Sequence, residues 1–191
     1  MHKKLLSKFY FVPDYDKDHI KNIDKKINII VRSYDKPINL KKLKEFRNFC
    51  KLNNYQIFLS NNLKIALNLK FDGIYIPSFN KKINFLLNKN TKNLKVIGSA
   101  HNIKEIKIKE KQGVEVLFIS PLFNLKKSNR FLEVLKFNLL AQTTSKKIIA
   151  LGGINQSNIK KLNLLKVEGF AGISYFQKKN GPLIKKGRLN F

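Results

Sequence analysis

The sequence predicts an α/β fold, and within that class a compact (β/α)8 TIM barrel of parallel strands. Eight short runs rich in β-branched and aromatic residues recur at regular intervals along the 191 residues. Most runs are continuously apolar, which is typical of strands buried on both faces of a parallel sheet. Segments with helical spacing separate them, and eight strand–helix units in succession close into a barrel. The runs are Phe9–Val12, Ile27–Val31, Gln56–Leu59, Gly73–Ile76, Leu94–Ile97, Val116–Ile119, Lys147–Leu151 and Gly169–Ile173.

The segments between these runs predict helices, because apolar residues recur there at spacings of three and four. Asparagine or serine stands before several of them, as at helix N-termini. No GxGxxG motif follows the first strand, so an open doubly wound sheet is the less favoured alternative. The residues that recur at these spacings are Leu40, Leu43, Phe46, Arg47 and Cys50; Ile65 and Leu69; and Ile83, Leu86 and Leu87. The longest apolar stripe is Phe131, Leu132, Leu135, Leu139 and Leu140. The capping candidates are Asn61, Asn102, Ser128 and Asn155.

One domain over residues 1–191 fits this length, which is slightly below the usual range of about 200 to 400 residues and predicts short loops. Residues 176–191 are polar and predict a short last helix or an extended, mobile end. The single cysteine, Cys50, cannot form an internal disulfide. No apolar run approaches the roughly 20 residues of a membrane-spanning helix, and none resembles a signal peptide. We therefore expect a cytoplasmic protein without a membrane partner.

Positive charge dominates the composition, since 39 Lys and Arg against 12 Asp and Glu give a formal net charge of +27. Almost all of it is lysine, spread in pairs along the whole chain. A nucleic-acid binder usually concentrates its cations and uses arginine to contact phosphates and guanine. The pattern favours solvated lysines on helix exteriors, so we expect no specific nucleic-acid partner. A nucleic-acid function would require an affinity that falls steeply with salt.

Glycines stand at the carboxyl ends of the last two predicted strands, where (β/α)8 barrels place their chemistry. The seventh strand leads into Ala-Leu-Gly-Gly-Ile-Asn, and the eighth contains Gly-Phe-Ala-Gly-Ile-Ser. Glycine lets the backbone approach a ligand and aim its N–H groups at it. We infer a cup for a phosphorylated small molecule that carries a phosphomonoester. Its candidate residues are Gly152, Gly153, Gly172, Ile173 and Ser174.

Seven segments, taken in order, resemble the thiamine-phosphate synthase family and its thiazole tautomerase relatives. The resemblance extends from Tyr10 to Ser174, and its most specific parts are SPLF, GGIN and GxxGIS. It implies a (β/α)8 barrel that joins hydroxymethylpyrimidine diphosphate to thiazole phosphate and releases pyrophosphate with magnesium bound. The segments are IIVR, LSNN, DGIYIP, IGSAHN, FISPLF, ALGGIN and GFAGIS.

The resemblance also implies roles for individual residues. Arg32 matches a family arginine that contacts the diphosphate, and Ser99 matches a family serine. Lys126 and Lys127 stand where the family has a hydroxyl-rich diphosphate loop, and they keep its positive charge. Together with Arg32 they would neutralise pyrophosphate as it leaves. The catalytic candidates are therefore Arg32, Ser99, Lys126 and Lys127.

The magnesium site is where the sequence departs from the family. Asn61 and Asn80 stand where the family has two metal-binding aspartates, after the third and fourth strands. Amide oxygens are neutral, so they attract Mg²⁺ far less than carboxylates do. We therefore expect weak Mg²⁺ binding at most. Two hypotheses follow: a divergent thiamine-phosphate synthase, or a non-catalytic barrel that binds thiazole phosphate or thiamine phosphate.

His101 is the histidine that stands near the end of a predicted strand. One interpretation makes it a general base or a substrate contact. The other makes it a structural residue that helps to cap the helix at Asn102. The catalytic histidine of the tautomerase relatives has no counterpart, because Pro121 stands at that place. The sequence leaves both interpretations open, and it does not indicate an oligomeric state.

Overall fold

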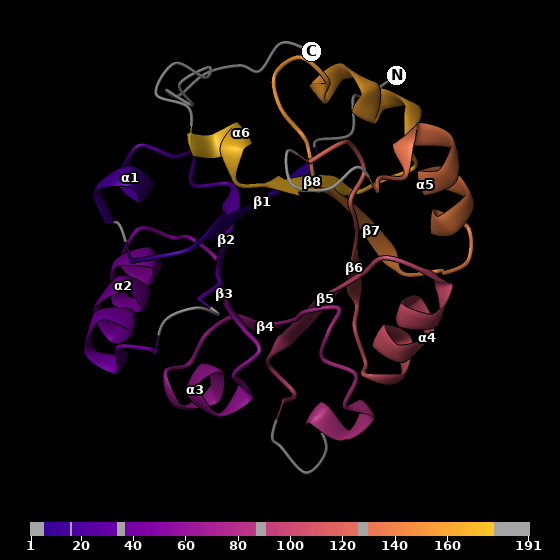
Figure 1. The fold of residues 1–191 in the computed structure, drawn as a ribbon. Helices are drawn as coiled ribbons and strands as arrows, with labels where there is room; N and C mark the ends of the chain where they lie inside the picture. The colour runs from indigo at the N-terminus through magenta and orange to yellow at the C-terminus, as the bar shows by residue number, and fades with distance from the viewer. Residues whose placement is uncertain (1–5, 16, 34–36, 87–90, 126–129, 178–191) are drawn as a thin grey trace.

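The structure is a computed structural model that describes residues 6–15, 17–33, 37–86, 91–125 and 130–177, and it confirms the predicted (β/α)8 barrel. Eight parallel strands follow one another around a closed ring in sequence order (Figure 1). β1 pairs with β8, with Tyr10 opposite Gly172, and this pairing closes the ring. Each predicted run overlaps one strand. The strands are β1 Ser7–Val12, β2 Ile27–Val31, β3 Ile57–Ser60, β4 Gly73–Ile76, β5 Lys95–Ala100, β6 Val116–Ile119, β7 Lys147–Leu151 and β8 Gly169–Gly172.

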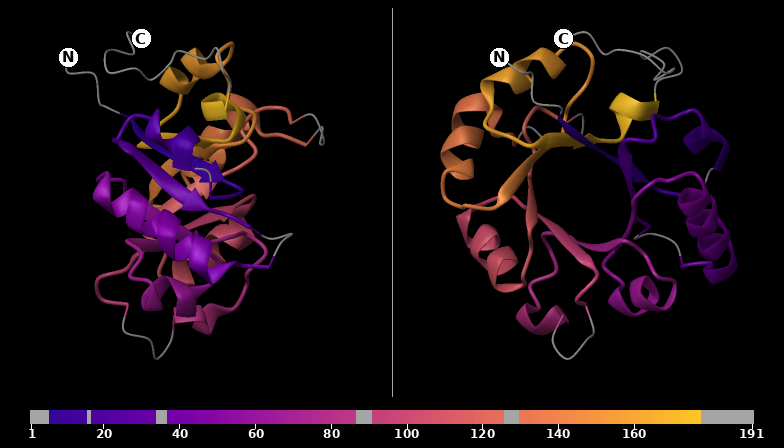
Figure 2. Two further views of the ribbon diagram at one scale, coloured as in Figure 1. Left: turned by 90° about the vertical axis from the view of Figure 1, so that its left-hand side faces the viewer. Right: turned by 180° about the vertical axis from the view of Figure 1, so that it is seen from behind.

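Short helices surround the barrel, one after each strand (Figure 2). Among the described residues, the connections after β4 and β7 carry a 3-10 helix in place of an α-helix. The helix predicted around Ile83 is one of these and ends at Leu86, while Leu87 lies outside the described residues. Within the described ranges, no helix is both long and apolar enough to cross a bilayer. The helices are α1 Lys17–Lys21, α2 Leu40–Leu52, α3 Leu63–Asn68, η1 Ile83–Leu86, α4 Ile103–Lys111, α5 Glu133–Ala141, η2 Ile159–Leu164 and α6 Ser174–Gln177.

Aromatic rings fill the interior of the barrel. Phe11 meets Tyr75 edge to face with ring centroids 5.1 Å apart, and Phe9 meets Phe118 in the same way at 5.0 Å. Such contacts add to the free energy gained by burying the rings. The barrel is therefore a packed core, and the rings form a floor beneath the end where the strands finish. The other buried side chains of this cluster are Ile30, Phe58, Ile97, Ile149 and Ala171.

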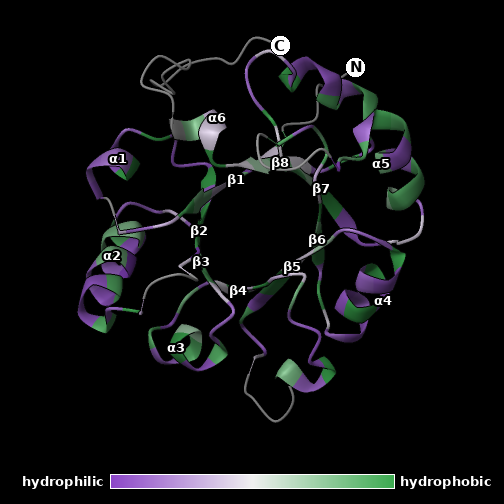
Figure 3. Cartoon of the chain, in the orientation of Figure 1, coloured by the Kyte–Doolittle hydropathy of each residue, from purple (hydrophilic) through white to green (hydrophobic). Residues whose placement is uncertain are grey.

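A second core lies between the strands and the helices, and α5 packs into it differently from the prediction. The predicted stripe included Leu135 and Leu139, but these side chains are 72% and 57% exposed. The buried face of α5 is formed by Phe137, Leu140 and Ala141, which recur at three and four residues. The prediction was right for the buried Leu140 and wrong for Leu135 and Leu139. Apolar residues occur on both sides of this helix, and spacing alone joined residues from two faces. Figure 3 shows the mixture of hydrophobic and hydrophilic residues on the helices.

The two faces of α5 predict different effects of mutation. We expect Leu135→Glu to change the free energy of unfolding by less than about 0.5 kcal/mol, because the side chain is already in water. Phe137→Leu should lower it by about 1 to 3 kcal/mol, because it leaves unfilled volume in the core. Urea unfolding of both variants measures the difference. A larger loss in Leu135→Glu than in Phe137→Leu would contradict the observed orientation of α5.

The asparagines before α3 act differently from the prediction. Asn61 was predicted to cap the helix, but the cap is Asn62, whose Oδ1 accepts a hydrogen bond from the N–H of Ile65 at 3.1 Å. Asn61 has a φ of 58°, in the left-handed region that asparagine tolerates better than most residues. The Asn61 side chain is therefore directed to another contact, described below.

Of the other predicted caps, one is confirmed, one is wrong and one is not described. Asn102 is confirmed, since its Oδ1 accepts from the N–H of Glu105 at 2.9 Å at the start of α4. The helical pattern does not begin after Asn155, because η2 starts only at Ile159. Ser128 lies outside the described residues.

The first residue of the polar segment predicted at 176–191 belongs to a short helix, α6. Phe176 is buried in α6, and its ring stacks on that of Phe170 with centroids 5.9 Å apart. Together the two rings pack α6 against the outside of β8. Residues 178–191 lie outside the described residues.

Candidate active site

Arg32 directly follows β2 at the mouth of the barrel, the end where the strands finish. Its backbone N–H donates to the carbonyl of Val12 at 3.0 Å, which extends the β1–β2 ladder by one residue. Its guanidinium carbon lies 5.4 Å from the centroid of the Phe11 ring, over the aromatic floor. This cation–π contact directs the charge toward the barrel axis. The predicted diphosphate contact is thus placed at the mouth.

The glycine pair after β7 adopts a conformation that other residues resist. Gly152 and Gly153 have φ values of 95° and 72°, in the left-handed region. A Cβ at Gly153 would lie 2.6 Å from the carbonyl oxygen of Phe123, and one at Gly152 would lie 2.9 Å from Pro121. Both contacts are with the loop after β6. The GGIN and SPLF segments are therefore packed directly against each other, and only glycine permits this approach.

An asparagine that the sequence analysis missed orients this loop. The Asn158 side chain donates to the carbonyl of Gly153 at 2.8 Å and accepts from the N–H of Asn155 at 2.9 Å. The peptide after Gly153 is thereby fixed in one orientation, as a backbone phosphate cup requires. The signal in the sequence is the spacing between Asn155, the last residue of GGIN, and Asn158. This spacing is typical of a loop whose side chains bond to its own backbone rather than of a helix start.

The second half of the predicted cup lies at the end of β8. A Cβ at Gly172 would come no closer than 3.5 Å to the Cβ of Tyr175, which is an ordinary contact. A Cβ alone is therefore accommodated at Gly172, unlike at Gly153. Ile173 follows directly, and Ser174 begins α6. Because β7 and β8 are neighbours in the barrel, the two glycine segments lie side by side.

A chain of hydrogen bonds crosses the mouth on the opposite side. The Oγ of Ser99 accepts from the N–H of Ser78 at 3.1 Å, and the Oγ of Ser78 lies 2.9 Å from Nε2 of His101. The Nδ1–H of His101 donates to the carbonyl of Ser120 at 2.7 Å, because a carbonyl can only accept. A neutral imidazole then presents Nε2 as the acceptor for the Ser78 hydroxyl. The ring bridges the ends of β4, β5 and β6.

His101 therefore does not cap α4 with its side chain. Asn102 caps the helix, and the backbone N–H of His101 donates to Glu105 Oε2 at 2.8 Å. The imidazole is exposed at the mouth and held in position from both ring nitrogens. Both ring nitrogens are thus bonded within the chain, which suits a structural residue. A role as general base or substrate contact stays a prediction for His101.

Asn61 and Asn80 are in contact, as their predicted common site requires. Asn80 Nδ2 donates to Asn61 Oδ1 at 2.7 Å, while Asn80 Oδ1 accepts from the N–H of Lys82 at 3.1 Å. The backbone N–H of Asn61 donates to the carbonyl of Tyr75 at 2.9 Å, which holds the end of β3 against the end of β4. Each side-chain amide oxygen is thus already occupied by a donor of this chain.

Comparison with known proteins identifies the family. The family model described as thiamine monophosphate synthase matches residues 24–176. The chain belongs to this family. The match includes Arg32, both asparagines and both glycine segments of the mouth. The resemblance of the seven segments is thereby confirmed.

Individual relatives agree with the assignment. The thiamine-phosphate synthase of Methanococcus vannielii is 28% identical over 70% of this chain and 65% of its own length. The putative thiamine-phosphate synthase 2 of Aquifex aeolicus is 30% identical over 70% of this chain and 72% of its own. The chain thus spans about two thirds of these curated relatives. A thiamine phosphate pyrophosphorylase structure from Pyrococcus furiosus, 19% identical, superposes with a TM-score of 0.69 over 90% of this chain and 86% of that one, which shows the shared fold.

The residues at the asparagine pair do not fit the magnesium ion that this family generally uses. Mg²⁺ prefers carboxylate oxygens in octahedral geometry. Here two amides are bonded to each other, and no cluster of three or more His, Cys, Asp or Glu side chains suited to a metal occurs in the part of the chain that the structure describes. The expectation of weak Mg²⁺ binding at Asn61 and Asn80 therefore stays a prediction, supported by their mutual hydrogen bond.

Behind the asparagine pair lies a buried lysine that the sequence analysis counted among surface charges. Lys109 is only 1% exposed, and its Nζ donates to the carbonyl of Asn80 at 2.6 Å and to Gln112 Oε1 at 2.8 Å. Gln112 Nε2 donates to the same Asn80 carbonyl at 3.0 Å and to that of Lys82 at 2.9 Å. Burial lowers the pKa of Lys109 to about 8, although Glu105 opposes the shift. α4 thus holds the loop after β4 from below.

This lysine makes stability depend on pH. Because its pKa falls from an ordinary 10.5 to about 8 on folding, the unfolded chain holds more protons between these values. This group's contribution to the free energy of unfolding should therefore rise with pH across that interval, by up to about 3 kcal/mol. Urea unfolding of wild type and Lys109→Met between about pH 7 and about pH 10.5 isolates it, since other titrating groups cancel in the difference. A difference that stays constant with pH would contradict the burial of a charged amine.

Lys126 and Lys127, the remaining catalytic candidates, lie outside the described residues. Their contact with the diphosphate therefore stays a prediction from the sequence.

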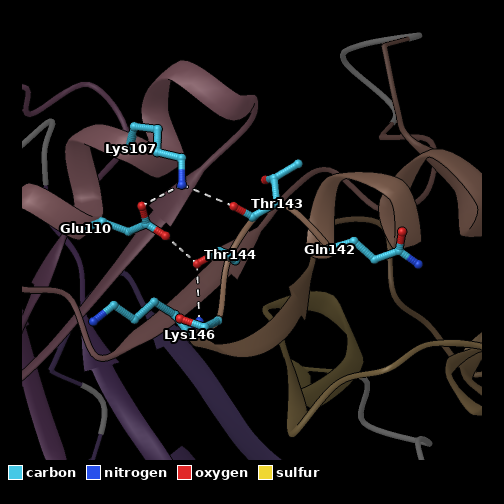
Figure 4. A pocket seen from close by; sticks show the side chains of 7 residues that line it. Lys107, Glu110, Gln142, Thr143, Thr144 and Lys146 are labelled. Carbon is cyan, nitrogen blue, oxygen red and sulfur yellow. Dashed lines mark hydrogen bonds and ion pairs between the residues drawn. The ribbon is translucent and has the colours of Figure 1, made fainter.

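A polar hollow between α4 and α5 lies away from the mouth, beside the loop that enters β7 (Figure 4). Lys107 Nζ lies 2.9 Å from Glu110 Oε2, and the Thr144 hydroxyl donates to Glu110 Oε1 at 2.6 Å. The hydrogen bond from Thr144 is the largest cause that holds the pKa of Glu110 below its usual range, and the hydrogen bond from Lys107 is the second. The contacts fasten the loop between α5 and β7 to α4. The hollow is therefore a structural contact at the amino end of the strands, and not part of the candidate active site.

Proposed function

We propose that this chain is a divergent thiamine-phosphate synthase, which joins hydroxymethylpyrimidine diphosphate to thiazole phosphate in thiamine biosynthesis. The proposal rests on the family match together with one feature of the mouth. That feature is the left-handed glycine pair, Gly152 and Gly153, packed on the SPLF loop and facing the second glycine segment at Gly172. Such a backbone cup suits the phosphate of the thiazole, and Arg32 suits the diphosphate.

The chemistry needs little more than these contacts. The bond between the pyrimidine methylene carbon and the diphosphate oxygen breaks, and its electron pair leaves with pyrophosphate. The thiazole nitrogen then donates its lone pair to the methylene carbon and forms the new C–N bond. The protein positions the nitrogen beside the carbon and stabilises the negative charge of the leaving group. In this proposal the cup around Gly153 positions the thiazole, and Arg32 with the predicted Lys126 and Lys127 receives pyrophosphate.

The test is the formation of thiamine phosphate from the two substrates by the full chain, followed by mass spectrometry. Gly172→Asp tests the cup, because a carboxylate placed there repels the thiazole phosphate, and urea unfolding of this variant establishes that it is folded. Its Cβ would make only an ordinary contact with Tyr175. We expect product with the wild type and little with Gly172→Asp. Absence of product at high enzyme concentration, with binding of both substrates shown by calorimetry, would overturn the proposal.

The second candidate is a barrel that binds thiazole phosphate or thiamine phosphate without turnover. The observation that favours it is the hydrogen bond between Asn61 and Asn80, which occupies the place of the family's metal ligands. It predicts that calorimetry detects the phosphate ligands and that Gly172→Asp abolishes their binding, while no product forms under any condition. The two candidates thus differ in one outcome of the same assay.

A further inference from the structure

The buried ammonium of Lys109 has uncharged partners. Among the described residues, its hydrogen bonds go to the Asn80 carbonyl and to the Gln112 side-chain oxygen, and none of the ion pairs includes it. The nearby acid, Glu105, directs Oε2 at the backbone N–H of His101 instead. Burying a charge without a counter-ion costs free energy. Because no counter-ion is bonded to Lys109, the electric field of its ammonium is only partly cancelled within the protein.

The sequence makes room for this lysine. Gly98 in β5 lies beneath it, and a Cβ there would stand 2.8 Å from the carbonyl oxygen of Ile76, 3.0 Å from Val114 Cγ2 and 3.2 Å from Lys109 Cδ. The absence of a side chain at Gly98 lets the lysine stem cross the strand toward the loop after β4. The Lys109 side chain thus packs over the part of β5 where Gly98 has no side chain.

Asn80 connects this charge with the mouth of the barrel. Its carbonyl accepts from Lys109 Nζ, and its side chain donates to Asn61, at the end of β3. Asn80 therefore separates the Lys109 ammonium from the place where, in the family, carboxylates would hold magnesium. The family's carboxylates would need a metal ion before a diphosphate could approach. This chain instead has two amides, with the buried ammonium of Lys109 bonded behind one of them. A low-polarity surrounding strengthens the effect of that charge at the mouth.

We propose that Lys109 replaces the charge of the divalent cation at this site, so that the mouth binds a diphosphate anion without metal. The proposal rests on the proposed function for the identity of the natural ligand, a diphosphate ester, but not for its test. Lys109 is a positioning residue in this scheme, because it acts through Asn80 and through its field. Asn80, Arg32 and solvent contact the ligand.

The probe is inorganic pyrophosphate, titrated into the full chain by calorimetry, once with a chelator and once with excess Mg²⁺. We expect binding with the chelator that is no weaker than binding with Mg²⁺. Lys109→Met should weaken it by about tenfold or more, the size of effect expected from one nearby buried charge. Lys111→Met removes an exposed lysine from the same helix and should change the affinity by less than about twofold, which controls for the net charge of +27. Circular dichroism and urea unfolding establish that each variant is folded.

Binding that requires Mg²⁺, or equal affinities for Lys109→Met and Lys111→Met, would overturn the proposal. If Lys109→Met does not fold, the pair Lys109→Gln and Lys111→Gln replaces it in the same titration. A second arm uses Mn²⁺ paramagnetic resonance: the wild type should bind no Mn²⁺, and the double variant Asn61→Asp, Asn80→Asp should gain a site. Mn²⁺ bound by the wild type with the affinity of the double variant would also overturn it.

The outcomes separate this proposal from the proposed function. Thiamine phosphate formed only with Mg²⁺ would overturn the role of Lys109 and leave the synthase assignment standing. Pyrophosphate bound without metal, and bound more weakly by Lys109→Met but not by Lys111→Met, with no product under any condition, would support the role of Lys109 and overturn the synthase assignment.

Discussion

Gly153→Ala should abolish the binding of thiamine phosphate at the barrel mouth, with a loss of affinity of at least about 100-fold. The alanine must adopt a φ of 72°, and its Cβ would lie 2.6 Å from the carbonyl oxygen of Phe123, so the loop after β7 has to move away from the SPLF segment. The backbone N–H groups of the cup then lose their common direction. Calorimetry with thiamine phosphate measures the loss, and urea unfolding should show a decrease of about 1 to 3 kcal/mol.

Gly113→Ala is the matched control for this variant. Gly113 also has a positive φ, 77°, but the nearest atom to its Cβ would be Leu86 Cδ1 at 4.0 Å, and it stands after α4 at the other end of the barrel. It should show a similar cost of backbone strain, about 1 kcal/mol, with unchanged ligand affinity. Wild-type affinity in Gly153→Ala, or an equal loss in Gly113→Ala, would show that the glycine pair does not form the phosphate cup.

Arg32→Gln should lower kcat by about 100- to 1000-fold, the effect expected when a group that stabilises developing charge is removed. The guanidinium carbon lies 5.4 Å from the centroid of the Phe11 ring, and in the proposed reaction it receives the leaving pyrophosphate. Steady-state kinetics with the pyrimidine diphosphate and the thiazole phosphate measures the change.

Arg32→Lys tests the geometry separately from the charge. Lysine keeps the cation but loses the planar fork and its stacking on Phe11, so we expect an intermediate loss that Arg32→Gln exceeds. The affinity for thiazole phosphate should be unchanged in both variants, because the glycine cup lies on other strands. Full activity in Arg32→Gln would contradict the proposed contact between Arg32 and the leaving pyrophosphate.

The sequence predicts the framework of this fold because buried parallel strands leave a strong local signal. The run Val116–Ile119 is apolar throughout and Ile27–Val31 is apolar except for Asn28, since both faces are covered, and their bounds agree with β6 and β2. α5 was less predictable, because Leu135 and Leu139 are apolar and exposed, and only the tertiary packing of Phe137 distinguishes the two faces. Hydrophobic spacing identifies an amphipathic helix well only where the outer face is polar.

The site was predictable where it depends on short motifs and unpredictable where it depends on long-range contacts. Arg32 and the glycine pair belong to motifs at the ends of strands. Lys109 contacts Asn80 across 29 residues of sequence, and in a chain so rich in lysine its surroundings look like a solvated helix surface. Its position three residues after the buried Ile106, on the inner face of α4, is the signal that distinguishes it.

The most direct test of the account is a crystal structure of the chain with thiamine phosphate. We predict that the phosphate lies against the backbone of Gly152, Gly153 and Gly172, with the pyrimidine directed toward Arg32 and the Asn61–Asn80 pair. A phosphate bound elsewhere, such as in the polar hollow between α4 and α5, with the glycine segments empty, would contradict it.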